Sequence, residues 1–330
     1  MPGRVLEMGS LTYPEFLALD RDKTVVLLAV SPTEIHGPHL PLCTDWFLAT
    51  EAARKAASQV LARLPDYDAL IAPTIALGSD VIPLPGSIGI RPRVLQGLVA
   101  DVGSALARAG FRYIAVLSGH GGPRHNAAIE LACREVNRKH RGAQMFSPTA
   151  ELIHYILLGS FQEDLQDRCQ GLLPEEDVRR LWPSDVHAGA LETSLGLLFM
   201  PDQVRPGYQV LPPVVFGEKK GAKASAARLL FRMAGRLVAL FSGKDAGFMR
   251  LFFDNLCESA LLWAGPQKSE MPLYAGYPGL ASESLGNAYT EMIAERGAAT
   301  VEEVVAGRKT AADTFTPLSR SFLMRMSMYL

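Results

Sequence analysis

Apolar runs of strand length alternate with longer helix-like segments over the first 200 residues, and this rhythm constrains the fold more than any other feature. The runs cover residues 24–30, 69–77 and 113–117. The helix-like segments, with apolar side chains at helical spacing, cover residues 46–64, 95–109 and 123–139. Strands that are apolar throughout and separated by helices form parallel sheets covered on both faces. The sequence therefore predicts an α/β fold with a mainly parallel central sheet.

Composition and charge exclude several classes of protein. Hydrophobic residues make up 48% of the 330, and the formal net charge is −1, so no overall positive field attracts nucleic acid or an anionic membrane. The four cysteines are widely spaced and form no CxxC pair, which favours a cytoplasmic location over a disulfide framework. No stretch is long and apolar enough to predict a membrane span, and no signal-peptide pattern opens the chain.

The segment after residue 217 departs from this rhythm. Arg228, Arg232 and Arg236 recur at four-residue steps. Apolar residues fall largely on the other side of the same predicted helix, namely Leu229, Leu230, Met233, Leu237 and Leu240. Such a basic amphipathic helix is typical of a surface or subunit interface, and contact with a membrane surface is the alternative.

Acidic and imidazole side chains gather directly after the first apolar run. Glu34, His36 and Asp45 fall within the twelve residues EIHGPHLPLCTD. Carboxylate oxygens and imidazole nitrogens are the ligands that zinc, manganese and iron ions prefer. If Glu34 and His36 point to the same side, both lie at the carboxyl end of a strand, where α/β sheets bind ligands. His39, beside Pro38, is interpreted as a residue that braces the loop.

Two later segments carry further candidate ligands. His120 lies in the glycine-rich SGHGG sequence, and His187 and Glu192 lie in DVHAGALETS. Ligands from three distant segments are what a dinuclear metal centre requires, with Asp45 as the best carboxylate to bridge two ions roughly 3.5–4 Å apart. The bare glycines beside His120 favour a ligand over a structural histidine. For His125, on the following predicted helix, support of the site and a surface position remain equal alternatives.

These motifs, in this order, resemble the creatininase family of creatinine amidohydrolase-like enzymes. The matching stretches are residues 33–45, 85–88, 118–122 and 187–194, and residues 277–281 resemble the turn before the family's last helix. The resemblance implies a three-layer α/β/α fold and two divalent ions, either zinc, manganese or iron. It also implies a homo-oligomer, often a hexamer. Against this family, residues 1–330 read as a single domain with a helical insertion at about 217–270.

The resemblance also assigns metal ligands by position. Glu34, Asp45 and His120 would hold one ion, and His36 with Asp45 would hold the other. His187 matches a histidine near the substrate that can move a proton.

One position departs from creatininase itself, which has a glutamate two residues after the histidine that matches His120. Here that residue is Gly122. We therefore expect Glu192 either to complete the second metal site or to support His187, and we count it with the catalytic residues. Glycine at this position resembles the deformylase-like branch of the family and argues against creatinine as the substrate.

The function predicted from the sequence is a metal-dependent hydrolase. It would cleave the C–N bond of a small amide, cyclic amide or formamide with water activated by two ions. One alternative is a peptidase that trims a modified peptide precursor. Another is a metal-binding, non-catalytic relative that acts as an assembly protein.

Overall fold

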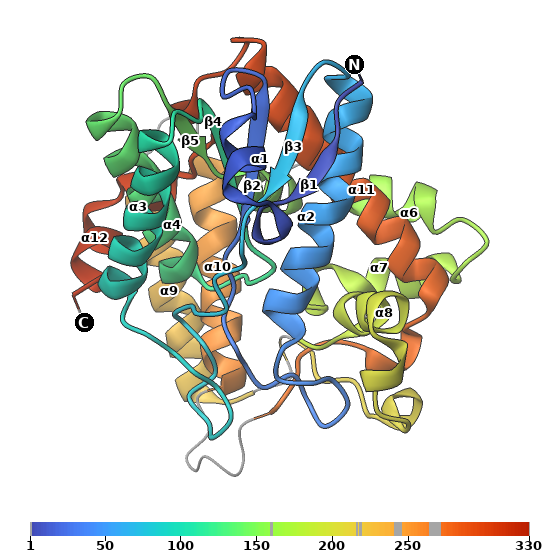
Figure 1. Cartoon of the computed structure of the whole chain (residues 1–330). Helices are drawn as coiled ribbons and strands as arrows, with labels where there is room; N and C mark the ends of the chain where they lie inside the picture. The colour runs from blue at the N-terminus through green and yellow to red at the C-terminus, as the bar shows by residue number, and fades with distance from the viewer. Residues whose placement is uncertain are drawn as a thin grey trace. The chain divides into compact units, whose positions relative to one another are not determined.

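The predicted parallel sheet lies at the centre of the first of two units in this computed structural model (Figure 1). The structure describes residues 2–158, 161–215, 217, 220–240, 246–263 and 272–329. Unit 1 comprises Met1–Glu34, Cys43–Ile153 and Ile293–Leu330, and unit 2 comprises Ile35–Leu42 and His154–Met292. The single domain predicted from the sequence is not tested by this division and stays a prediction.

Five parallel strands form the sheet of unit 1, in the order β1-β3-β2-β4-β5. The strands are β1 Val5–Glu7, β2 Thr24–Ala29, β3 Asp68–Ile71, β4 Tyr113–Leu117 and β5 Gln144–Phe146. The apolar run at 69–77 is thus a strand only over its first three residues, 69–71. The chain winds outward from β2 in both directions, so the strand order reverses between β2 and β4. In open parallel sheets, ligands bind at the carboxyl ends of the two strands that flank such a reversal.

Helices cover both faces of this sheet. Side chains alternate along β2, so that Val26 and Leu28 face one layer and Val25 and Leu27 face the other. The first layer is built by α3 Pro92–Arg108 and α4 Pro123–Lys139, and the second by α2 Thr44–Arg63 and the end of α11 Glu283–Val305. Figure 1 shows α3 and α4 together on one side of the sheet and α2 on the other. The predicted three-layer α/β/α arrangement is confirmed.

The remaining helices are short or belong to unit 2. They are α1 Tyr13–Leu17, α5 Pro148–Leu158, α6 Phe161–Arg168, α7 Glu175–Ser184, α8 Ala190–Phe199, α9 Ala222–Leu240, α10 Ala246–Trp263 and α12 Phe322–Ser327. Single 3-10 turns occupy Met8–Ser10, Pro201–Gln203, Tyr208–Val210, Pro278–Leu280, Ala311–Thr314 and Pro317–Arg320. Among the described residues, no helix combines the length and the apolar character that a bilayer crossing needs.

The predicted basic amphipathic helix is α9, and its apolar side is the exposed one. Leu229, Leu237 and Leu240 are 62%, 59% and 79% exposed. Its basic edge instead faces α10, where Arg228 donates to both carboxylate oxygens of Glu258 at 2.6 and 2.9 Å. Residues 218–219, 241–245 and 264–270 of the predicted insertion lie outside the described residues. That this segment is an insertion stays a prediction.

A buried acid on α4 gives unit 1 a pH-dependent stability. Glu130 is fully buried and accepts a hydrogen bond of 2.7 Å from the Thr316 hydroxyl. Burial raises the pKa of Glu130 from 4.5 to about 7, although hydrogen bonds from Ser319 and Thr316 and the charge of Arg134 oppose the rise. The folded chain therefore keeps a proton that the unfolded chain releases.

We expect the free energy of unfolding to fall as pH rises from 4.5 to about 7. In this range the unfolded chain has released the proton of Glu130 while the folded chain still binds it, so each rise in pH favours the unfolded state. The contribution of Glu130 to that fall is on the order of 3 kcal/mol. Glu130→Gln should remove this part of the slope in urea unfolding measured at several pH values. Glu163→Gln, at an exposed carboxyl on α6, should leave the slope intact. An unchanged slope in the Glu130 variant would contradict the assignment.

Candidate metal centre

Three of the predicted ligands converge in unit 1. Glu34 follows β2, His120 follows β4, and Asp45 lies in the first turn of α2. Their exposed fractions are only 1%, 8% and 3%. The Nδ1 atom of His120 lies 3.2 Å from Oε2 of Glu34 and 3.1 Å from Oδ2 of Asp45. The two strands that flank the reversal of the sheet, together with the start of α2, thus bring together one imidazole and two carboxylates.

These distances suit a bound divalent cation. Ligand atoms about 2.0–2.1 Å from a tetrahedral ion lie roughly 3.3 Å from one another. The Nε2–H of His120 donates to the Ser79 carbonyl at 3.1 Å, so Nδ1 is the nitrogen that can coordinate. A hydrogen bond from the far ring nitrogen to a carbonyl is the usual support of a metal-bound histidine. Glu34 is fixed as well, because its Oε1 accepts from the Ile82 amide at 2.5 Å.

The charge of the cluster also favours a cation. Burial by itself lowers the pKa of His120, but Asp45 and Glu34 raise it well above its ordinary value. Even with a protonated imidazole, two buried carboxylates leave the cluster negative. Buried charges of this kind are stabilised by pairing or by a metal. A divalent ion could replace the imidazole proton and balance both carboxylates.

His125 supports the His120 ring from behind. It is fully buried, and the two rings meet edge to face with centroids 5.1 Å apart. The Ser79 amide donates to Nδ1 of His125 at 3.3 Å, while Nε2–H donates to the Val30 carbonyl at 3.3 Å. Burial, and then the charge of His120, lower the pKa of His125 to about 3. Of the two alternatives left open by the sequence, the surface position is therefore wrong.

Glycine at position 122 is required by this packing. A Cβ atom there would lie 2.5 Å from Nε2 of His120 and 2.7 Å from Cβ of Asp80. Asp80 is itself held in the left-handed region, with φ 64°, and accepts from the backbone and the guanidinium of Arg124 at 2.5 Å. A glutamate at Gly122 would therefore displace the His120 ring. Residues 79–82 were not among the predicted site residues, since Ser79 and Ile82 act through backbone atoms that any residue has.

The other three predicted site residues gather in unit 2. Nε2 of His36 lies 3.6 Å from Oε2 of Glu192, and the His36 and His187 ring centroids are 4.3 Å apart. The Nε2–H of His187 donates to the Ile35 carbonyl at 2.7 Å. Glu192 also accepts a hydrogen bond of 2.5 Å from the amide of Ala188. The backbone of Ala188 lies in the left-handed region, with φ 47°. Glu192 thus faces His36 and holds the loop of His187, and its two expected roles stay predictions.

His39 braces the loop that carries it, as interpreted from the sequence. Its Nε2 lies 2.8 Å from the Thr193 hydroxyl. Burial, and then the charge of His36, lower the pKa of His39 to about 4. Gly37, with φ 67°, passes so close that a Cβ would lie 2.8 Å from Nδ1 of His39. His39 is therefore a packing residue of the loop.

Asp185 organises the loop that carries His187. It accepts from the amides of Ala190, Leu191 and Tyr277 at 2.7, 2.8 and 3.0 Å. Burial raises the pKa of Asp185, and these three hydrogen bonds partly offset the rise. Its carboxylate thus fixes the start of α8 against the turn at 277, which orients the loop between them.

The family follows from comparison with known proteins. The family model described as creatinine amidohydrolase matches residues 9–301. The chain belongs to the creatininase family. Creatinine amidohydrolase of Pseudomonas putida is 26% identical over 258 residues, which cover 70% of this chain and 90% of that enzyme. Mycofactocin precursor peptide peptidase of Mycolicibacterium smegmatis is 30% identical over 182 residues, which cover 54% of this chain.

The match to that peptidase spans 60% of the peptidase's own length. Solved creatininases share the fold over about nine tenths of the chain. One, "Creatininase Mn", aligns with a TM-score of 0.57 at 20% identity and covers 90% of this chain and 97% of its own. A creatinine amidohydrolase (creatininase) crystal structure aligns with a TM-score of 0.54 at 19% identity, covering 92% and 97%. At this identity, the likeness shows the fold alone.

The two neighbouring glycines allow a matched test of the His120 geometry. Gly122→Ala should tilt the His120 ring and weaken divalent-cation affinity at least about tenfold, the loss expected when the support of a ligand is disturbed. Gly121→Ala, where a Cβ would meet nothing within 4 Å, should bind the cation like the parent. Titration of zinc or manganese into chelator-treated protein measures both. Equal affinities in the two variants would contradict the packing argument.

Proposed function

We propose that the chain is a metal-dependent hydrolase that cleaves the C–N bond of a small amide, cyclic amide or formamide. The observation that carries the proposal is the buried cluster of Glu34, Asp45 and His120, with the ring nitrogen of His120 directed at both carboxylates. We expect zinc, manganese or iron as the ion, and two solved creatininases, named with manganese and with zinc, support the first two of these metals.

We further propose a second ion, held by His36 and Glu192, with Asp45 as the bridge between the two. The support is the sequence proximity of His36 to Glu34 and the 3.6 Å approach of His36 to Glu192. Glu192 takes the part of the glutamate that Gly122 cannot supply. Two ions bridged by one carboxylate are the usual arrangement for hydrolytic dinuclear sites.

A bound divalent ion would polarise the substrate carbonyl and lower the pKa of a water molecule. The residues of the chain would hold and move the protons. We assign proton transfer to Nδ1 of His187, because its Nε2–H is committed to the Ile35 carbonyl. Transfer to the leaving nitrogen completes cleavage of the C–N bond. Glu192 would keep His187 in place through the Ala188 amide.

A peptide substrate is the second candidate, favoured by the relatives named mycofactocin precursor peptide peptidase. The chemistry is the same and only the size of the substrate differs. A panel of formamides, lactams, small linear amides and short peptides, each with and without chelator, separates the two. Chelator should abolish turnover of whichever class is cleaved. Cleavage by a metal-free preparation would overturn the proposed metal dependence, and bound metal without any turnover would favour the assembly protein.

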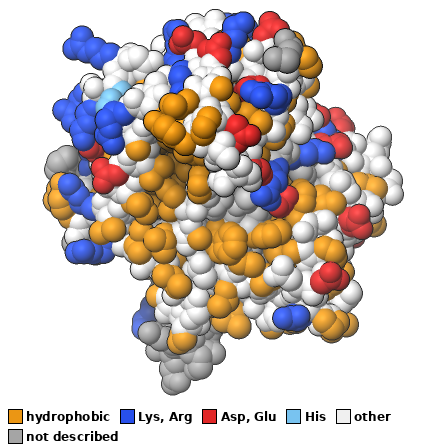
Figure 2. Space-filling model, viewed as in Figure 1, with side chains coloured by type: hydrophobic (Ala, Val, Ile, Leu, Met, Phe, Trp, Pro, Cys, Tyr) orange, Lys and Arg blue, Asp and Glu red, His pale blue; other side chains and the backbone are white. Residues whose placement is uncertain are grey.

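We also propose a homo-oligomer in the cytoplasm. The exposed apolar residues of α9 support it, because large apolar patches usually mark interaction surfaces. Figure 2 shows hydrophobic side chains gathered across the middle and lower part of the viewed face. Sedimentation of the parent and of a Leu229→Lys, Leu237→Lys double variant tests the oligomer. A parent that sediments as a monomer would contradict it.

Metal stoichiometry tests the assignment of the ligands. Asp45→Ala should lose both ions, whereas His120→Ala and His36→Ala should each lose one, because only Asp45 is proposed to serve both. Turnover should fall by about a thousandfold or more in each. His140→Ala, at the far end of α4, should keep both ions and full turnover. Elemental analysis of the purified variants gives the counts, and an Asp45 variant with one ion retained would disprove the bridge.

A further inference from the structure

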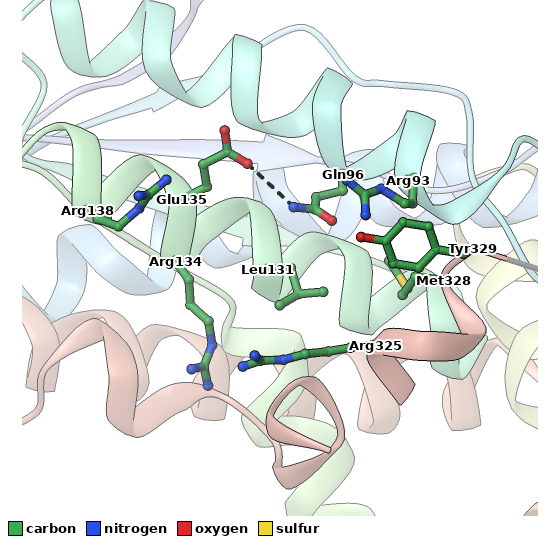
Figure 3. Close-up of a pocket in the computed structure, with 9 residues that line it drawn as sticks. All are labelled: Arg93, Gln96, Leu131, Arg134, Glu135, Arg138, Arg325, Met328 and Tyr329. Carbon is green, nitrogen blue, oxygen red and sulfur yellow. Dashed lines mark hydrogen bonds between the residues drawn. The ribbon is translucent and has the colours of Figure 1, made fainter. Parts of the chain in front are cut away.

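A second site of unusual charge lies in unit 1, apart from the residues of the metal centre. A cavity of about 450 Å³ opens between α3, α4 and α12 (Figure 3). Four arginines line it, namely Arg93, Arg134, Arg138 and Arg325. Its volume lies within the range of small-molecule sites.

Among the described residues that line the cavity, Glu135 supplies the one carboxylate, which does not balance these arginines. Glu135 accepts from the Lys139 ammonium at 2.6 Å and from the Gln96 amide at 3.4 Å. Figure 3 shows the Gln96 contact on the wall opposite Arg325. Glu130 is the other acid near Arg134, and its own burial favours the neutral form. The cavity therefore carries a strong positive charge.

Arg134 is the clearest sign of a missing acceptor. Its Nε and Nη2 atoms are buried and, among the residues that the structure describes, make no hydrogen bond. The guanidinium carbon of Arg134 lies 4.9 Å from the centroid of the Phe315 ring. This contact stabilises the flat face of the guanidinium but gives no acceptor to the N–H groups along its edge. Buried donors of a charged group without acceptors are strongly destabilising. An acceptor that enters the cavity would remove this penalty.

Arg325 lies beside Arg134, so that two like charges meet. Figure 3 shows the two guanidinium groups next to each other on the same wall, with no drawn carboxylate between them. Burial, and then the charges of Arg320 and Arg325, lower the pKa of Arg134. Arg93 is held at the other end of the cavity, with its guanidinium 4.1 Å from the Tyr329 ring centroid. Paired arginine forks match the oxygens of a phosphate group.

We propose that this cavity binds the phosphate group of a small phosphorylated molecule, with Arg134 and Arg325 as its bidentate partners. Arg93 and the Tyr329 ring, at the other end, contact the remainder of the ligand. The guanidinium charges match a phosphate dianion better than a single carboxylate. The volume exceeds that of inorganic phosphate, so the organic part adds to the affinity.

The proposal is tested by calorimetric titration of the full chain after chelation, because phosphate also binds metal ions. The probes are glucose 6-phosphate, AMP, inorganic phosphate and acetate. We expect at least one organic phosphate to bind about tenfold or more tightly than inorganic phosphate, and acetate to bind more weakly still. If inorganic phosphate binds as tightly as both organic probes, the proposal that Arg93 and Tyr329 contact the organic part of the ligand is wrong.

Variants locate the binding. Arg134→Gln and Arg325→Gln should each weaken the organic phosphate about tenfold or more, the loss expected for charged hydrogen bonds. Arg325 is exposed, so its variant should fold even if that of Arg134 does not. Arg141→Gln, exposed and just beyond α4, and His120→Ala should keep parent affinity. Affinity lost in His120→Ala but kept in both cavity variants would overturn the proposal, as would no binding of any phosphate up to about 10 mM.

Discussion

The arrangement of the site depends on one hydrogen bond, from Nε2–H of His120 to the Ser79 carbonyl. It selects the tautomer in which Nδ1 faces Glu34 and Asp45, and without it either nitrogen could point at the carboxylates. The same residue 79 donates its amide to His125, which packs against the back of the His120 ring. One peptide segment thus fixes both histidines, and the rest of the loop is built around their rings.

Much of this could be read from the sequence because it follows from periodicity. Apolar runs ending at residues 30 and 117 predicted two buried strands, and the next ionisable side chains, Glu34 and His120, were expected at their carboxyl ends. Parallel strands place those ends on one edge, so convergence was predicted without knowing the strand order. The closeness of Asp45 to this pair was expected from the dinuclear hypothesis, and the structure brings it within 3.1 Å of His120.

Other features could not be predicted, because they do not depend on the type of side chain at a position. The contacts of Ser79 and Ile82 use backbone atoms, whose positions depend on the path of a loop rather than on residue type. The burial of His125 was undecided because a helix position alone does not say which face meets the core. For α9, the amphipathic pattern predicted two faces but not that ion pairs with α10 would leave the apolar face exposed.

Helix α4 connects the features of unit 1 that carry charge. It begins directly after the His120 loop, and its first turns bear His125 on the side that meets the sheet. Further along, burial raises the pKa of Glu130 to about 7, and two buried guanidinium atoms of Arg134 have no acceptor among the described residues. A helix interior of alanines and branched residues could pack this layer without any of these groups. Polar side chains on the inner side of a helix are costly for stability, and ligands at either end would offset part of that penalty.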